Sequence, residues 1–203
     1  MSPSQRERVL LNVGCGPRNA STLPSYFDGW RQLRVDVDAS VGPDIIADLT
    51  DLSSIPDGSA DAVWAAHCVE HLYGHQVSVA LAEFRRVLRD DGFVCVIVPD
   101  LQAVAQYVVD DRMHEPLYHS PAGPVTPHDI FFGFGAAIAS GHTSMAHRCG
   151  FTPGSLQRCF QHQNFGELLV RRRIADFELA AVARATVAKD DEERAALMAA
   201  LEL

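Results

Sequence analysis

The sequence predicts a single α/β domain over residues 1–203, a three-layer sandwich on a mostly parallel sheet of about seven strands that ends in an antiparallel hairpin. Short apolar segments bounded by Gly, Pro, Asp or Ser alternate with segments of helical spacing, which is typical of a parallel sheet. Near the C-terminus, two apolar segments are joined by only two residues, and so short a link favours a hairpin. With 47% hydrophobic residues, the chain can bury one sizeable core.

The strands can be located in chain order. The first is the apolar segment 9–13, and the second covers residues 32–38 and ends in carboxylates. Only a brief helix fits between them, because the connection is short and contains Pro24 and Gly29. Three further strands are expected at residues 44–48, 59–66 and 93–98. The last of these is continuously apolar, as in a strand buried on both faces.

The remaining segments complete the layers. Apolar spacing predicts a helix over residues 77–88. Residues 110–150 are rich in Pro, Gly and His and are too long for an ordinary connection, so we expect a lid or substrate-binding insertion. A helix is expected from Thr152 to about His162. The hairpin strands are expected at 168–174 and 177–182, followed by an amphipathic helix that covers the body or, in a homodimer, a second subunit.

Composition excludes several classes of protein. The formal charge of −9 disfavours a nucleic-acid partner, because phosphate binding depends on clustered Lys and Arg, and the basic cluster 171–173 is expected to be a solvated face. The N-terminal residues show no signal peptide, and no apolar stretch is long enough for a membrane partner, so a soluble, cytoplasmic protein is expected. The five scattered cysteines form no Cys-x-x-Cys pair, so they are expected to be free thiols.

The segment after the first strand carries the clearest functional signal. Gly14 and Gly16 lack a Cβ, so the peptide N–H groups there can approach a ligand closely. Carboxylates follow the next two strands, at Asp36, Asp38 and Asp48. Because the carboxyl ends of parallel strands meet at one edge of a sheet, a single crevice there is expected to contain all of these residues.

Five ordered segments resemble the class I S-adenosylmethionine-dependent methyltransferases, a family with a Rossmann-like fold. They correspond to the first motif, the ribose-binding motif, the adenine-side loop, the fourth strand with its following loop, and the helix and turn before the fifth strand. The segments are residues 10–17, 34–38, 47–52, 55–63 with 67–72, and 84–92. The resemblance covers residues 8–100 closely and 151–183 more loosely. It implies a methyltransferase with S-adenosylmethionine as its cofactor.

The resemblance also implies cofactor-binding residues. Ribose hydroxyls are expected to bind Asp36, or else Asp38, and Asp48 with the Leu49 backbone is expected to flank the adenine. The residues carried over are Asn12, Gly14, Cys15, Gly16, Asp36, Val37, Asp38, Asp48, Leu49 and His67. Asn12 stands where many members have an acidic residue, a third glycine near Arg18 is missing, and the first helix is shorter than in most members.

The expected reaction is methyl transfer to an oxygen or nitrogen of a small-molecule acceptor, such as a sugar-like metabolite. A neutral histidine can remove the proton of an oxygen nucleophile as the new bond forms, and the candidate catalytic residues are His67, His128 and His142. His67 follows the fourth strand, where it would face the reactive end of the cofactor; a histidine there also serves as a hydrogen-bonded structural residue. No metal ligand is assigned in this interpretation.

Three alternatives share these residues. His67-Cys68-Val69-Glu70-His71 spells His-x-x-Glu-His, the pattern of a zinc hydrolase in which two histidines bind the metal. A nicotinamide dehydrogenase opens with the same strand and glycine turn, but its third glycine would fall at Asn19. A non-catalytic module that binds S-adenosylmethionine would keep the fold without the chemistry.

Overall fold

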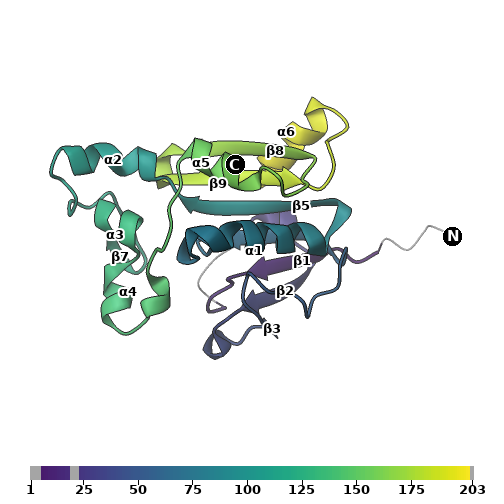
Figure 1. The fold of residues 1–203 in the computed structure, drawn as a ribbon, viewed down its shortest axis with the longest axis horizontal. Coiled ribbons are helices and arrows are strands. Elements are labelled where there is room, and N and C mark those ends of the chain that lie inside the picture. Colours follow the sequence, from purple (N-terminus) through teal and green to yellow (C-terminus); the bar gives the residue numbers. More distant parts are fainter. Residues whose placement is uncertain (1–5, 19–22, 202–203) are drawn as a thin grey trace.

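Seven strands form one sheet in the computed structural model, which describes residues 6–18 and 23–201 (Figure 1). The strands are β1 (Val9–Val13), β2 (Arg31–Asp36), β3 (Ile45–Ile46), β4 (Ala60–Ala66), β5 (Leu88–Pro99), β8 (Glu167–Arg173) and β9 (Glu178–Arg184). Their order is β3-β2-β1-β4-β5-β9-β8, and β1 to β5 run parallel. β9 is antiparallel to both β5 and β8, so the predicted fold class and its closing hairpin are confirmed.

Helices cover the sheet and its carboxyl edge. The α-helices are α1 (Gly74–Val87), α2 (Leu101–Val109), α3 (Pro127–Phe132), α4 (Gly135–Ala139), α5 (Pro153–Phe160) and α6 (Asp191–Ala200). The 3-10 turns are η1 (Ser25–Phe27), η2 (Ala39–Val41), η3 (Val69–His71), η4 (Thr143–Met145) and η5 (Ile174–Asp176). None of the helices in residues 6–18 and 23–201 is long and apolar enough to cross a membrane.

Helix α1 packs on the same face of the sheet as α5. Its apolar spacing buries Val77, Leu81 and Phe84 in the larger core, as predicted. The helix begins three residues before the predicted start, because the side chain of Gln76 accepts a hydrogen bond from the Tyr73 N–H and caps the first turn. Leu88, predicted at the end of this helix, instead begins β5.

An aromatic cluster fills part of the opposite face of the sheet. Tyr26, Phe27 and Trp30 surround the connection that leads into β2, and they pack against Trp64 of β4 and Phe93 of β5. The only helical segment in the described part of the β1–β2 connection is η1, in agreement with the predicted brief helix. These rings bury a large apolar area, so they stabilise the face where a longer helix would otherwise pack.

The C-terminal helix α6 covers the body of the chain. Leu197, Met198 and Leu201 are buried in the same cluster as the aromatic rings. The acidic first turn of the helix, capped by Asp190, suits the positive end of the helix dipole. The sequence predicted that this helix would cover either the body of the chain or a second subunit. In the structure it packs on the core of its own chain.

Replacing Met198 with alanine is expected to destabilise the protein by about 2–5 kcal/mol, the range for removing a buried large side chain. Met198 is only 2% exposed, so the substitution leaves a cavity under α6. Chemical denaturation measures the change in the free energy of unfolding. Val187→Ala is the control, since Val187 is 62% exposed and the same measurement should give a change within about 0.5 kcal/mol. A similar stability for both variants would contradict the packing of α6.

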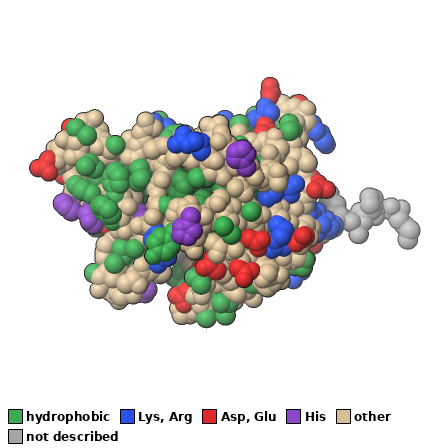
Figure 2. Space-filling model, viewed as in Figure 1, with side chains coloured by type: hydrophobic (Ala, Val, Ile, Leu, Met, Phe, Trp, Pro, Cys, Tyr) green, Lys and Arg blue, Asp and Glu red, His purple; other side chains and the backbone are tan. Residues whose placement is uncertain are grey.

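Residues 101–150 form a small lobe beside the carboxyl edge of the sheet (Figure 1). The lobe contains α2, the hairpin of β6 (Tyr118–Ser120) and β7 (Gly123–Val125), α3 and α4, around a core of Val104, Val125 and Ile130. The expected insertion therefore contains helices and a hairpin, and it has less irregular structure than its composition indicates. Figure 2 shows hydrophobic side chains gathered on the surface over α2 and α3.

An ion pair fastens the start of α2 to the hairpin, and a second one joins the two hairpin strands. Asp100, 1% exposed, caps α2 by accepting from the N–H groups of Gln102 and Ala103, and it pairs with Arg172 Nε at 2.7 Å. Arg173 pairs with Glu178 at 2.7 Å. Two of the three arginines in the basic cluster therefore serve internal contacts. All five cysteines are free thiols, as predicted.

Candidate functional site

The turn after β1 has the backbone that its glycines predict. Gly14 has φ 60° and Gly16 has φ 57°, both in the left-handed region that favours glycine. A Cβ at Gly14 would lie 2.4 Å from the Cβ of Cys68, so the missing side chain lets this turn pack against the loop after β4. The N–H of Cys15 donates to the Val35 carbonyl at 3.2 Å, which anchors the turn to β2.

Asp36 joins the glycine turn to the end of β2. Its Oδ2 accepts from the Gly16 N–H at 2.9 Å, and its Oδ1 accepts from the Asp38 N–H at 2.9 Å. Each carboxylate oxygen has a second lone pair, so a half-buried Asp36 can still accept from ribose hydroxyls. The carboxylate therefore stabilises the turn, a role that the sequence did not predict. Its contact with the ribose stays a prediction.

Val37 and Asp38 form an exposed rim beside this turn. Val37 is 64% exposed, and Asp38 Oδ1 accepts from the Ser40 N–H at 2.8 Å. Hydrogen bonds from Ser40 lower the pKa of Asp38, and the charge of His142 lowers it further.

Asp48 and Leu49 lie after the short strand β3. Asp48 Oδ1 accepts from the Thr50 N–H at 2.8 Å and from the Thr50 hydroxyl at 2.6 Å. Leu49 packs into the larger core and is 9% exposed. Contact of this segment with an adenine ring, which stays a prediction, would therefore come from its main chain and from the exposed carboxylate.

Arg34 was missed by the sequence analysis and lies buried beneath the glycine turn. Its guanidinium donates to the carbonyls of Gly16 and Gly42. A charged residue between the apolar Leu33 and Val35 is the signal that could have identified it. Arg34 lines a cavity of about 330 Å³ together with Asn12, Cys15, Pro17, Arg18, Leu23, Asp28 and Gln32. Asn12 and Cys15 therefore border this cavity, while Gly14 and Gly16 shape the turn itself.

His67 directly follows β4 with φ 53°, a left-handed conformation that is uncommon for a residue with a side chain. Its Nε2 lies 2.9 Å from Glu178 Oε1, and its Nδ1 lies 3.6 Å from Glu70 Oε1. Burial lowers the pKa of His67, but hydrogen bonds to Glu178 and Glu70 outweigh it and raise the pKa to about 10. The two carboxylates favour the protonated ring, and the role of His67 as a catalytic base stays a prediction.

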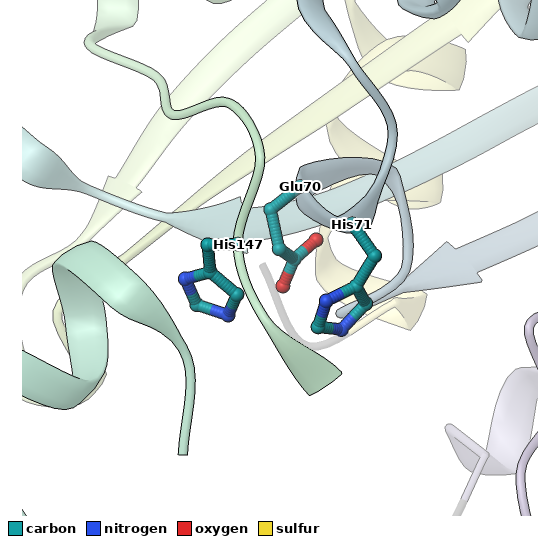
Figure 3. A group of neighbouring side chains, drawn as sticks. All are labelled: Glu70, His71 and His147. Atoms are coloured by element: carbon teal, nitrogen blue, oxygen red, sulfur yellow. The ribbon is translucent and has the colours of Figure 1, made fainter. Parts of the chain in front are cut away.

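The loop after β4 carries a second polar cluster, formed by Glu70, His71 and His147 (Figure 3). Glu70 is 1% exposed, and the neighbouring His67 charge outweighs its burial and lowers its pKa. His147 Nδ1 lies 3.0 Å from the Ile130 carbonyl, and burial lowers the pKa of His147. The centroids of the His71 and His147 rings are 5.1 Å apart.

This arrangement contradicts the zinc-hydrolase pairing of His67 with His71. Residues Val69–His71 form a 3-10 turn in place of the α-helix that would place both imidazoles on one side. His67 pairs with Glu178, while His71 faces His147. Neither Glu178 nor His147 could have been found from local spacing, because both lie far along the chain from the loop after β4.

The other two candidate histidines lie within the lobe. His128 belongs to α3. Its ring centroid lies 5.2 Å from that of His114, on which the ring stacks, and 5.0 Å from that of Phe132. His142 is exposed, and its Nδ1 lies 3.0 Å from the Ser140 hydroxyl. The structure thus separates His67, at the end of β4, from His128 and His142, which lie in the lobe.

Comparisons with known proteins agree with this fold. Residues 11–96 match the family model described as a methyltransferase domain. A search of the curated proteins found no match. One similar solved structure is a SAM-dependent methyltransferase from Archaeoglobus fulgidus, which is 14% identical and has a TM-score of 0.56. The similarity covers 88% of this chain and 86% of that one. The CurJ carbon methyltransferase covers 91% of this chain and 50% of its own at 11% identity, with a TM-score of 0.56.

One similar structure was solved with ligands. The 1,6-didemethyltoxoflavin-N1-methyltransferase of Burkholderia thailandensis, with 1,6-didemethyltoxoflavin and S-adenosylhomocysteine bound, is 19% identical and has a TM-score of 0.54. The similarity covers 90% of this chain and 72% of that one. Together, the methyltransferase domain matched over residues 11–96 and the shared fold make the chain similar to the S-adenosylmethionine-dependent methyltransferases.

Proposed function

We propose that this methyltransferase acts on an oxygen or nitrogen atom of a small molecule, such as a sugar-like metabolite. The observation that carries the proposal is the crevice edge: a glycine turn braced by Asp36, with a separate lobe of residues 101–150 beside it. A lobe of this size next to the cofactor edge can enclose an acceptor of modest size. The N1-methyltransferase with bound 1,6-didemethyltoxoflavin supports a nitrogen acceptor, whereas the carbon methyltransferase shows that similar folds reach other atoms.

The residues at this edge fit a nucleoside cofactor. The turn at Gly14 and Gly16 has the left-handed backbone that favours glycine, and Asp36 retains lone pairs for ribose hydroxyls. S-adenosylmethionine, when bound, supplies a methyl group that is already activated for displacement. The protein is therefore required mainly to hold the acceptor atom close to that methyl and in line with it. Positioning of this kind lowers a barrier by roughly 7–11 kcal/mol.

Proton removal is assigned to the lobe and not to the end of β4. Both ring nitrogens of His67 face carboxylates, which raise its pKa and favour the protonated ring over one that accepts a proton. His142, exposed and with its Nδ1 3.0 Å from the Ser140 hydroxyl, is the first candidate base for an oxygen nucleophile. His128, half-buried in α3, is the second.

The proposal is tested by a methyl-transfer assay with isotopically labelled S-adenosylmethionine and panels of small-molecule alcohols, phenols and amines. Transfer to a member of these panels is expected, with a loss of about 10²–10⁴-fold in turnover for His142→Ala or His128→Ala if the acceptor is a hydroxyl. The matched control is His75→Ala, a histidine on α1 that stacks on Tyr73. Cofactor binding without transfer to any acceptor would favour the non-catalytic module.

A further inference from the structure

We propose that Glu70, His71 and His147 bind one divalent transition-metal ion, with Zn²⁺ as the best match. One carboxylate oxygen of Glu70 and one ring nitrogen of each histidine lie within 4.8 Å of one another. In Figure 3 the carboxylate points into the space between the two imidazoles. Three electron-pair donors that converge this closely, from segments 76 residues apart, are arranged as metal ligands commonly are.

The buried carboxylate is the independent observation that points to a ligand. Glu70 is 1% exposed, and its Oε2 has no hydrogen-bond partner among residues 6–18 and 23–201. Its other oxygen faces His67 Nδ1 at 3.6 Å. A buried carboxylate oxygen without a partner is costly, because it has lost its contacts with water. A cation between Glu70 and the two histidines would supply the missing interaction.

The main chain holds the two segments together before any ion binds. The N–H groups of Arg148 and Cys149 donate to the Glu70 carbonyl at 2.9 and 3.2 Å. His71 Nδ1 lies 3.2 Å from the Ala146 carbonyl, within the segment that carries His147. Main-chain hydrogen bonds and one contact of the His71 ring therefore hold the two segments together, and they leave the Nε2 atom of His71 free.

The histidine environments also suit metal binding. His147 Nδ1 lies 3.0 Å from the Ile130 carbonyl. A carbonyl oxygen only accepts hydrogen bonds, so Nδ1 carries the proton in the neutral ring and Nε2 keeps the lone pair that a metal ion takes. Metal-bound histidines usually donate their second ring N–H in this way, and the contact fixes both the tautomer and the ring orientation.

The donor set selects the class of ion. Two imidazole nitrogens and one carboxylate oxygen match Zn²⁺, whereas Mg²⁺ and Ca²⁺ prefer all-oxygen sites. Three protein ligands leave a fourth tetrahedral position for water or a bound acceptor. The site differs from the His-x-x-Glu-His prediction, because His147 from the lobe replaces His67, which pairs with Glu178. It also uses none of the residues expected to bind the methyl donor, apart from the contact of Glu70 with His67.

The test is Zn²⁺ binding measured by elemental analysis after dialysis and by titration calorimetry, both without S-adenosylmethionine. The unmodified protein is expected to bind about one equivalent, and its thermal midpoint is expected to rise with Zn²⁺ because the ion binds only the folded state. His147→Ala is expected to weaken Zn²⁺ binding by more than about 100-fold. His75→Ala, a histidine on α1 that lies outside the site, is expected to bind as the unmodified protein does.

Substitution with Co²⁺ provides a spectroscopic check. A tetrahedral nitrogen and oxygen site is expected to give an intense visible absorption that Glu70→Gln and His147→Ala lose. Circular dichroism of the metal-free proteins distinguishes loss of the site from loss of the fold, and His71→Ala replaces Glu70→Gln if the latter does not fold. Absence of stoichiometric Zn²⁺ in the unmodified protein, or equal binding by His147→Ala and His75→Ala, would overturn the proposal. Neither outcome bears on methyl transfer, which is measured separately.

Discussion

Replacing Gly16 with valine is expected to abolish binding of S-adenosylmethionine while leaving a folded protein. Gly16 has φ 57°, and a β-branched residue in this region costs about 1–3 kcal/mol of backbone strain. A shift of the strained backbone would also disturb the hydrogen bond from the N–H of residue 16 to Asp36, so the turn would lose the shape expected to admit the cofactor. Titration calorimetry measures the affinity, and circular dichroism measures the fold.

The chain offers a closely matched control in Gly58. It has φ 58°, and a Cβ built there meets nothing within 4 Å. Gly58 precedes β4, at the edge of the sheet opposite the glycine turn. Gly58→Val therefore adds similar strain without touching the crevice and should keep the cofactor affinity. Retained affinity in Gly16→Val, or equal losses in both variants, would show that the turn after β1 is not the binding element.

Replacing Asp36 with alanine is expected to weaken cofactor binding by about 1.5–3 kcal/mol, the range for hydrogen bonds to a charged group. This loss corresponds to roughly a 10- to 150-fold higher Kd. The carboxylate acts in two ways here, because it would accept from the ribose and it already accepts from the N–H groups of Gly16 and Asp38. Calorimetric titration with S-adenosylhomocysteine measures the change.

Two further variants separate the roles of the neighbouring carboxylates. Asp38→Ala removes the alternative ribose partner but leaves the brace between Asp36 and Gly16. Asp91→Ala removes the same charge from an exposed position in the first part of β5, at the opposite edge of the sheet, and should leave Kd unchanged. A larger loss for Asp38→Ala than for Asp36→Ala would move the ribose contact to Asp38. Unchanged affinity in both would argue against the crevice.

Local sequence patterns predicted most of the sheet. The strands are marked by short apolar segments between turn residues, and the glycine turn is marked by residues whose backbone freedom is needed there. The 101–150 lobe was harder to predict, since strands of three residues and helices of five or six have too few residues to show a period. Helix α2 was missed for a related reason, because its start depends on the buried cap at Asp100.

The contacts within the site could not be predicted from local patterns. Glu178 meets His67 only because β9 inserts next to β5, which places the start of one strand beside the end of another. His147 meets Glu70 through main-chain hydrogen bonds between a loop and the lobe. The contact between Gly14 and Cys68 likewise depends on the pairing of β1 with β4. Sequence reasoning identified the residue types at the sheet edge, whereas the topology determined which of them meet.

The most direct test of the account is a crystal structure of the protein with S-adenosylhomocysteine. The account predicts ligand density at the carboxyl edge of the sheet, with the ribose beside Asp36 or Asp38 and the amino-acid end against the turn of Gly14 and Gly16. Density for the nucleoside at another place on the molecule, with this turn unchanged and solvent-exposed, would contradict it.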